Sequence, residues 1–410
     1  MNRRTFIKTG MLFGISPQIL HAIEKTSTKK CVFIFLGGGI SHIEFINPIP
    51  EAPVEYRSTT GSIATKSGYQ IGGSFTNLAK CSELFTTVRS FSHRDANHNS
   101  AAHWVNTGKL AFNIGDMGRS IEPSYGSIVC HEFSPTSKLG MPHYVKVNPI
   151  PHDDASWLGA KYMGYDNDSE MAKAVKANKE KFKRRIDMLN IVNKGSEKLG
   201  NDSKLFKDWG EIRNLASDII NGDASAAFDV SLEPNNIRES YKEQSSVFGR
   251  SLLTARRLIE NDCKFVTVAN NGWDHHSDIK ANFENQASEL DHCLSTFLLD
   301  LSDRGLLKDT LVVITSEFGR TPKLNNGSGS SSGRDHYPSV NSLILAGGSY
   351  GNNLIGETDS KASTVVSDKF SPGDLSWTIM NHFGIDKTLM IVDNQKRPRF
   401  IFDKESKLII

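Results

Sequence analysis

Acidic residues and histidines gather in three short clusters within residues 270–338. The sequence reads GWDHH at 272–276, SEFGR at 316–320 and GRDHY at 333–337, and each cluster lies at or near the end of an apolar run. Ligands of open α/β sheets bind in the crevice outside the carboxyl ends of the strands, so side chains delivered there build a site. The carboxylates and imidazoles together predict a metal-dependent hydrolytic centre.

The first cluster places Asp274 and His276 two residues apart. At the edge of a strand, residues with this spacing face the same side, so one carboxylate and one imidazole could hold a single ion. His275 would then point away from the ion. For an isolated cluster we would favour a simpler interpretation, in which Asp274 caps a turn and the histidines are surface residues. The two neighbouring clusters favour the metal site.

The second and third clusters supply further candidate ligands. Glu317 follows the apolar run 311–315. A carboxylate there must be paired, hydrogen-bonded or bound to metal, because an unpaired buried charge is costly. Asp335 and His336 precede another apolar run. Oxygen and nitrogen ligands of these types suit zinc or manganese, with calcium as a further candidate.

Two arginines accompany these ligands. Arg320 and Arg334 could neutralise an anionic substrate group, because guanidinium groups bind oxyanions in a bidentate way. The alternative is plain ion pairing, of Arg320 with Glu317 and of Arg334 with Asp335. The stretch 325–333 between the clusters reads NNGSGSSSG. It is typical of a flexible loop, for which a mobile lid and an ordinary surface loop are both open interpretations.

Apolar patterning indicates the elements that must position these residues. Continuous apolar runs predict buried, mainly parallel strands at 30–36, 142–147, 264–269, 311–315 and 343–346. Helical spacing predicts amphipathic helices at 248–259 and 287–301.

A strand, a helix and a strand in this order form a right-handed parallel crossover, so we expect the strands 264–269 and 311–315 to be neighbours. A shorter helix is predicted at 98–108, where Asn99 or Ser100 could cap its first turn. The fold class is therefore α/β, with a central, mostly parallel sheet flanked by helices.

Composition and charge exclude several other classes. The chain has 410 residues, 48 of them basic and 46 acidic, for a net charge of +2. This balance gives no general drive toward nucleic acid. The five cysteines form no Cys-x-x-Cys pair, so we interpret them as small buried apolar residues.

Two segments stand apart from a single α/β domain that we expect to span residues 26–410. Residues 168–245 predict a helical insertion. Within it, residues 171–189 carry seven Lys or Arg with Glu180 and Asp187 interleaved, which favours a solvated helix face over a nucleic-acid patch.

The other segment, residues 1–22, resembles a twin-arginine export signal. Arg3 and Arg4 precede Phe6-Ile7-Lys8, and an apolar run too short to span a bilayer follows. We therefore expect the twin-arginine export machinery as a partner and a periplasmic or secreted protein. The mature chain should have no stable membrane insertion.

Longer motifs resemble an exported bacterial family called domain of unknown function 1501. The resemblance spans residues 31–386 and rests on LGGGISHIEFINPIP, HNSAAHWVNTG, FGRSLLTARRLIENDCKFVTV, GWDHH, DRGLLKDTLVVITSEFGRTP, GRDHYP and SLILAGG. That family is similar to the alkaline phosphatase and sulfatase superfamily. The resemblance implies a sheet flanked by helices, with one or two metal ions at the strand ends.

The resemblance also implies roles for single residues. Asp274 and His276 would be the metal-binding pair, Glu317 would replace an aspartate, and His336 would be the final histidine. Asp335 could compensate for a missing ligand, because Phe318 follows Glu317 where the superfamily usually has a second one.

The first strand shows a second departure from the superfamily. The glycines at 37–39 follow it where the superfamily often has an aspartate, and His42 and Glu44 could substitute as metal ligands.

The nucleophile is the remaining question of the resemblance. In sulfatases a short motif ending in Thr-Gly opens with the nucleophile, and residues 98–108 resemble that motif. The position falls near His98, Asn99 or Ser100. Ser100 would be an ordinary nucleophile, with helix capping as the alternative, whereas His98 would be a metal ligand or a covalent phosphoryl acceptor.

These observations predict an exported metal-dependent hydrolase that cleaves a phosphate or sulfate ester of a small molecule or carbohydrate. Ser100, His98 and Arg320 are the candidate catalytic residues. The alternative is a catalytically inactive relative that retains a metal ion and acts as a binding or scaffold protein.

Overall fold

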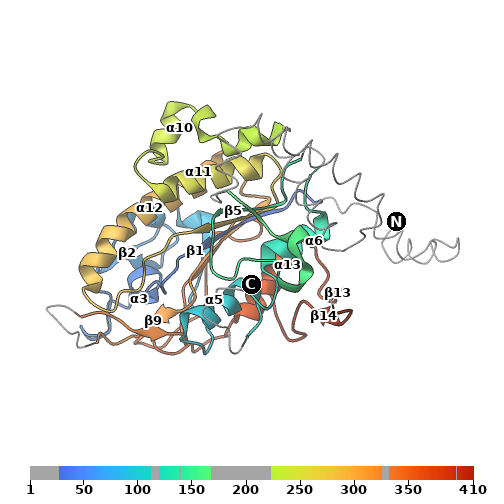
Figure 1. The fold of residues 1–410 in the computed structure, drawn as a ribbon. Coiled ribbons are helices and arrows are strands. Elements are labelled where there is room, and N and C mark those ends of the chain that lie inside the picture. The colour runs from blue at the N-terminus through green and yellow to red at the C-terminus, as the bar shows by residue number, and fades with distance from the viewer. Residues whose placement is uncertain (1–26, 112–119, 138–139, 168–222, 326–331, 394) are drawn as a thin grey trace, which may run out of the picture.

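The computed structural model describes residues 27–111, 120–137, 140–167, 223–325, 332–393 and 395–410 (Figure 1). The twin-arginine segment, the basic stretch at 171–189 and most of the predicted insertion lie outside these residues. Among the described helices, none has the length and apolar character needed to cross a bilayer.

An eight-stranded sheet forms the centre of the described fold. In spatial order its strands are β12 (Asn353–Ile355), β4 (Phe85–Val88), β11 (Leu343–Ala346), β8 (Thr310–Thr315), β1 (Lys30–Phe35), β7 (Phe265–Ala269), β5 (Tyr144–Asn148) and β6 (Tyr165–Asp166). β11 pairs antiparallel with both β8 and β4, whereas the other pairings of this sheet are parallel. The predicted α/β class with a mostly parallel sheet is confirmed.

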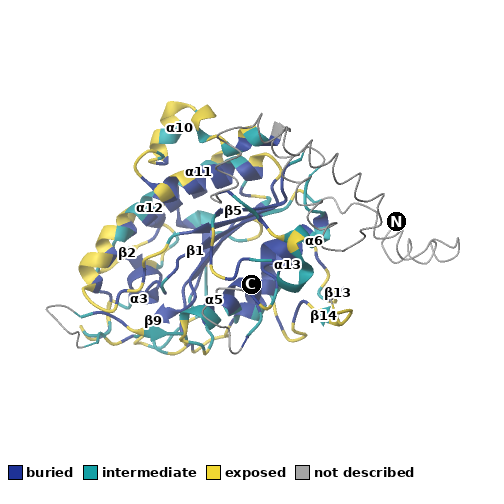
Figure 2. Ribbon diagram, viewed as in Figure 1, coloured by how far each residue is buried: buried dark blue, intermediate teal, exposed yellow. Residues whose placement is uncertain are grey.

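Helices cover both faces of the sheet (Figure 1). One face packs against α4 (Thr76–Lys80), α11 (Val247–Glu260) and α12 (Ile279–Asp303), and the other against α5 (His98–Thr107), α6 (Tyr125–Phe133) and α13 (Pro372–His382). Successive residues of a strand point to opposite faces. Val32 and Ile34 of β1 therefore enter the first core and Phe33 and Phe35 the second. Figure 2 shows the strands buried between the helical layers.

Smaller elements complete the described fold. They are the helices α3 (His42–Phe45) and α10 (Asn235–Ser240), and the strand pairs β2 (Ser62–Ala64) with β3 (Gln70–Gly72), β9 (Gly319–Arg320) with β10 (His336–Tyr337), and β13 (Met390–Val392) with β14 (Pro398–Phe400). The 3-10 helices are η1 (Ser82–Leu84), η2 (Ser156–Leu158), η3 (Ala160–Tyr162), η4 (Asp223–Phe228) and η5 (Val230–Leu232).

The expected adjacency of β7 and β8 is wrong, because β1 lies between them. β1 pairs in parallel with both strands, and Phe35 is in register with Ala269 on one side and Thr315 on the other. The crossover through α12 therefore skips one strand position. The three strands end at the same level, so the segments that follow them leave one edge of the sheet together.

Residues 223–245, the described part of the predicted insertion, contact α11 through charged side chains. Glu233, just after η5, accepts a hydrogen bond from Arg256 Nη1 at 3.0 Å and also pairs with Arg257. Arg256 is almost fully buried and reaches Asp300 of α12 at 3.2 Å. A buried arginine needs such acceptors, and here they join three helical segments. The five cysteines are free and buried, as predicted from the sequence.

Asp153 is a carboxyl group that the fold buries beside the central sheet. Its Oδ2 accepts a hydrogen bond of 2.7 Å from Thr267 Oγ1 of β7. Burial raises the pKa of Asp153 to about 7, more than the hydrogen bonds from Thr267 and Ser124 lower it. The folded state thus holds a proton that the unfolded chain releases near pH 4.

This difference predicts a pH-dependent stability. Because the folded-state pKa is the higher one, stability from this proton is present below about pH 4 and lost as pH rises through about 7. Asp153→Asn keeps the shape and removes the titration. From pH 4 to 8, denaturant unfolding should show the variant gaining on the order of 2–4 kcal/mol relative to the wild type. Parallel stability curves for the two proteins would contradict this account.

Candidate metal centre

The glycines after β1 allow three chain segments to meet at the edge of the sheet. Gly38 has φ +108°, and a Cβ on it would lie 2.8 Å from the backbone nitrogens of both Trp273 and Asp274. Its own N–H donates to Glu317 Oε1 at 2.8 Å. A side chain here would separate the segments after β1 and β7. The glycines thus permit a close approach of the backbone segments that follow β1 and β7.

Asp274, His276 and His336 form a small triangle of ligand atoms above this edge. Asp274 Oδ1 lies 2.9 Å from His276 Nε2 and 3.2 Å from His336 Nε2. The two imidazole nitrogens are 3.1 Å apart. The ligands of a tetrahedral zinc ion bound at about 2.0 Å stand about 3.3 Å apart. The triangle therefore has the dimensions of three corners of such a site.

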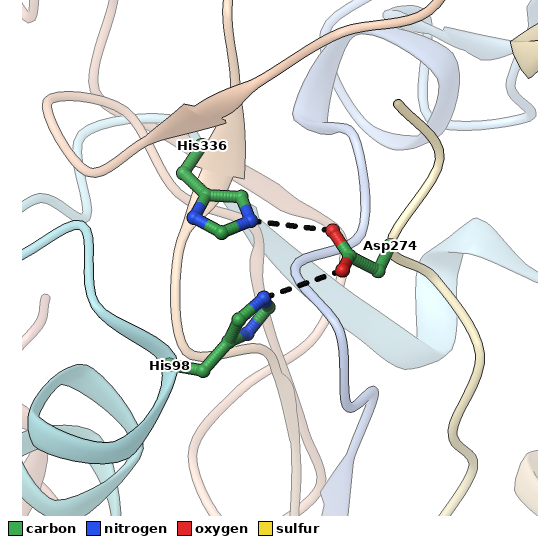
Figure 3. Close-up of side chains that lie close together, drawn as sticks. All are labelled: His98, Asp274 and His336. Atoms are coloured by element: carbon green, nitrogen blue, oxygen red, sulfur yellow. Dashed lines mark hydrogen bonds and ion pairs between the residues drawn. The ribbon is translucent and has the colours of Figure 1, made fainter. Parts of the chain in front are cut away.

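His98 approaches the same centre from the first turn of α5. Its Nε2 lies 3.5 Å from Asp274 Oδ2, while His336 faces the other oxygen of that carboxylate (Figure 3). Ligand atoms of His98, Asp274 and His336 all lie within 4.8 Å of one another. His98 Nε2 is buried and makes no hydrogen bond. A metal ion between these groups would satisfy it.

Acceptor groups outside the centre fix the orientation of each histidine. Nδ1 of His98 lies 2.7 Å from Glu317 Oε1, and Nδ1 of His276 lies 2.7 Å from Asp335 Oδ1. Nδ1 of His336 lies 2.9 Å from the carbonyl oxygen of Ala96. Carboxylates and carbonyls only accept, so each neutral imidazole keeps its proton on Nδ1 and turns the Nε2 lone pair to the centre. Metal-binding histidines are commonly held in this way.

Electrostatics keep the central carboxylate ionised. Burial raises the pKa of Asp274, but the hydrogen bond and charge of Arg320, together with His276 and His98, outweigh it and lower that pKa to about 2. Burial and the charge of Arg320 also lower the pKa of His336, which favours its neutral form. The hydrogen bond with Glu317 and the charges of Glu317 and Asp274 raise the pKa of His98 instead, so a cation that binds there competes with a proton.

Arg320 does not pair with Glu317, nor is it free to bind an oxyanion. It is fully buried, and its Nε donates to Gly39 O at 2.7 Å. One terminal nitrogen donates to the Arg334 carbonyl at 3.0 Å and approaches His276 Nε2 at 3.4 Å. The other donates to Gly38 O and Asp274 Oδ1. All five N–H groups thus have protein acceptors, which corrects the expected substrate-binding role.

Arg334, Glu44 and His42 lie outside the centre, contrary to expectation. Arg334 Nε donates to Glu44 Oε1 at 3.0 Å, and its other N–H groups donate to backbone carbonyls. The side chains of Arg334 and Glu44 are completely buried and form an internal ion pair. Asp335 contacts His276 instead of Arg334. His42 Nε2 contacts Ala362 O at 2.9 Å. Neither His42 nor Glu44 has a group left to bind a metal ion.

Asn97, rather than Asn99 or Ser100, caps α5. Its side chain accepts from the backbone N–H groups of Asn99 and Ser100, and the helix begins at His98. Residues two apart on a helix stand about 200° around its axis, so His98 and Ser100 face different sides. Because His98 faces the centre, Ser100 is directed away from it and is a poor candidate nucleophile.

His275 faces away from the centre and is buried. Its ring packs against Trp273 at 5.9 Å and Phe283 at 6.2 Å between centroids. Asn325, at the base of the predicted loop, donates to Asp335 Oδ1 at 3.2 Å, and its N–H donates to Gly333 O at 3.0 Å. The middle of that loop, 326–331, lies outside the described residues.

The loop before α5 supplies contacts that the sequence did not reveal. The Ala96 carbonyl orients His336, and His93 Nε2 lies 2.6 Å from the backbone oxygen of Glu317. A carbonyl group has no signature in the sequence, because every residue carries one. The only available signal was proximity to His98. The ligand side chains are 25% to 46% exposed, so the centre opens to solvent.

The chain belongs to the family described as Protein of unknown function (DUF1501), which matches residues 28–409. A search of curated proteins finds no match.

Several solved structures are similar at low identity. A sulfatase from Pseudoalteromonas sp. is 11% identical, with a TM-score of 0.42, over 91% of this chain and 70% of that one. A protein in the alkaline phosphatase superfamily from Vibrio parahaemolyticus is 9% identical, with a TM-score of 0.37, over 88% of this chain and 68% of that one. A phosphonate monoester hydrolase from Silicibacter pomeroyi is 10% identical, with a TM-score of 0.37, over 93% of this chain and 76% of that one. These similarities are too low to transfer an activity.

The contact of Glu317 with His98 predicts an effect on metal affinity. Glu317→Gln keeps the shape of the side chain but removes the charge that favours a lone pair on His98 Nε2. Partners of this kind typically change metal affinity by about 10- to 100-fold. Isothermal titration with Zn²⁺ should show a loss in that range. Glu357→Gln, at an exposed position, is the control and should leave the Zn²⁺ affinity unchanged. Equal Zn²⁺ affinities for the two variants would contradict the orienting role of Glu317.

Proposed function

We propose that this member of the family is a metal-dependent hydrolase that cleaves a phosphate or sulfate ester. The observation that carries the proposal is the convergence of three imidazole Nε2 atoms on one carboxylate, with each Nδ1 facing an acceptor. Imidazole nitrogens and a carboxylate oxygen are the ligands that zinc and similar divalent ions use in proteins. The centre is open to solvent, so a substrate could reach it.

The donor set fits zinc or manganese better than calcium. His98, His276 and His336 offer nitrogen and Asp274 offers oxygen, whereas calcium takes oxygen ligands. A bound divalent ion would polarise an ester oxygen and lower the pKa of a water molecule. The residues of the chain hold the imidazoles in place and keep Asp274 ionised. Because Ser100 is directed away, we propose that water attacks directly, without a serine intermediate.

The substrate would be a small molecule or carbohydrate ester. The sulfatase, phosphatase-superfamily and phosphonate-hydrolase names among the similar structures belong to those proteins, and they define the panel of esters to test. The second candidate is an inactive relative that retains metal. The saturation of Arg320 and the orientation of Ser100 favour it, because neither residue can serve an incoming ester.

We also propose that the protein is exported in folded form. Arg3 and Arg4 followed by Phe6-Ile7-Lys8 support this proposal. Replacement of both arginines by lysine should retain the protein in the cytoplasm, as cell fractionation would show. Normal arrival of the double variant in the periplasm would contradict the twin-arginine assignment.

Removal of one imidazole tests the metal centre. His336→Ala should lower the affinity of the protein for Zn²⁺ or Mn²⁺ by at least about tenfold. Even substitutions of residues that only contact the ligands reduce metal affinity by that much. His336→Ala should also reduce the increase in Tm that metal produces, because an ion bound by the folded state stabilises it by mass action. Ester hydrolysis should fall with metal content.

The matched control is His131→Ala. His131 lies on α6 and contacts Glu132 and Tyr162 instead of the centre. This variant should keep its metal and activity. A His336→Ala protein with full metal content would contradict the assignment. A wild-type protein that binds Zn²⁺ but hydrolyses none of a panel of phosphate monoesters, diesters and sulfate esters would support the inactive relative.

A further inference from the structure

The guanidinium of Arg320 has the surroundings of a bound cation. Its acceptors are one carboxylate oxygen, from Asp274, the backbone oxygens of Gly38, Gly39 and Arg334, and, at 3.4 Å, Nε2 of His276. A carboxylate with several carbonyls is also the oxygen set that a divalent ion would use. The side chain of Arg320 is fully buried, so the guanidinium itself is shielded from solvent. The position beside the histidines is therefore already filled by a positive charge.

We propose that Arg320 is the fixed second cation of this centre, which consequently holds one divalent ion and prefers singly charged esters. The preference for singly charged esters rests on the proposed hydrolase function. The limit of one divalent ion follows from the space and charge around Arg320. A second ion beside Asp274 would have to displace a guanidinium that has five hydrogen bonds to protein acceptors.

The backbone makes this cation difficult to displace. A Cβ on Gly39 would lie 3.3 Å from Arg320 Nε and 2.5 Å from the ring of Phe318. The ring of Phe318 lies 5.8 Å from the guanidinium carbon. The glycine turn and this ring thus enclose the guanidinium. Phe318 also occupies the position where a further metal-binding side chain could have followed Glu317.

A charge inventory then limits the substrate. Asp274, Glu317 and Asp335 contribute three negative charges in contact with the histidines. Arg320 and one divalent ion contribute three positive charges, so the loaded centre is neutral. Arg334 adds nothing, because Glu44 neutralises it. A singly charged phosphate diester or sulfate ester disturbs this balance less than a doubly charged phosphate monoester.

Metal stoichiometry tests, without any catalysis, whether Arg320 limits the centre to one divalent ion. Elemental analysis of wild-type protein dialysed against excess Zn²⁺ should give one ion per chain at the centre. Arg320→Ala should allow a second ion, whereas Arg334→Ala, which also removes a buried arginine, should not. Two ions per wild-type chain would overturn the proposal. If Arg320→Ala does not fold, the wild-type stoichiometry decides.

The charge preference is tested on the zinc-loaded protein. At pH 8.5, kcat/KM should be at least about tenfold higher for bis(4-nitrophenyl) phosphate or 4-nitrophenyl sulfate than for 4-nitrophenyl phosphate. A preference for the doubly charged monoester would overturn the proposal. If none of these esters is hydrolysed, the proposed function fails separately. Calorimetric binding of dimethyl phosphate against methyl phosphate then decides, with tighter binding of the single charge expected.

Discussion

The ion pair of the buried Arg320 with Asp274 is the interaction on which the rest of the centre depends. The guanidinium keeps the carboxylate ionised and, through Gly38, Gly39 and Arg334, ties together the segments that follow β1, β8 and the loop before β10. A buried arginine without acceptors would be strongly unfavourable, so the turn after β1 must present its carbonyls. The carboxylate is then held where the histidines can meet it.

Two levels of contacts surround that pair. Asp274 and the Nε2 atoms of three histidines face the centre, and Glu317, Asp335 and the Ala96 carbonyl hold the far side of each ring. The outer contacts come from the end of β8, from the segment before β10 and from the loop before α5. Because every inner ligand has an outer partner on another segment, the geometry depends on the whole edge of the sheet. This dependence suits a site that must remain open to solvent yet keep ligand positions fixed.

Part of this arrangement could be predicted from the sequence. The apolar runs located β1, β7, β8 and β11 closely, and the rule that sites form at strand ends placed Asp274, His276 and Glu317 at one edge. Sequence patterns did not place β1 between β7 and β8, because pairing order depends on long-range packing. Nor did they separate Glu44 from the centre: its pairing with Arg334 joins residues far apart in the chain.

Anomalous diffraction from crystals of the zinc-loaded protein is the most direct test of the central claim. The account predicts one strong peak, within about 2.0–2.2 Å of Asp274 and of the Nε2 atoms of His276 and His336, with His98 Nε2 facing the same ion. The Arg320 guanidinium should remain beside it. A peak bound through Nδ1, a peak at Glu44 or His42, or an empty centre in zinc-saturated crystals would contradict it.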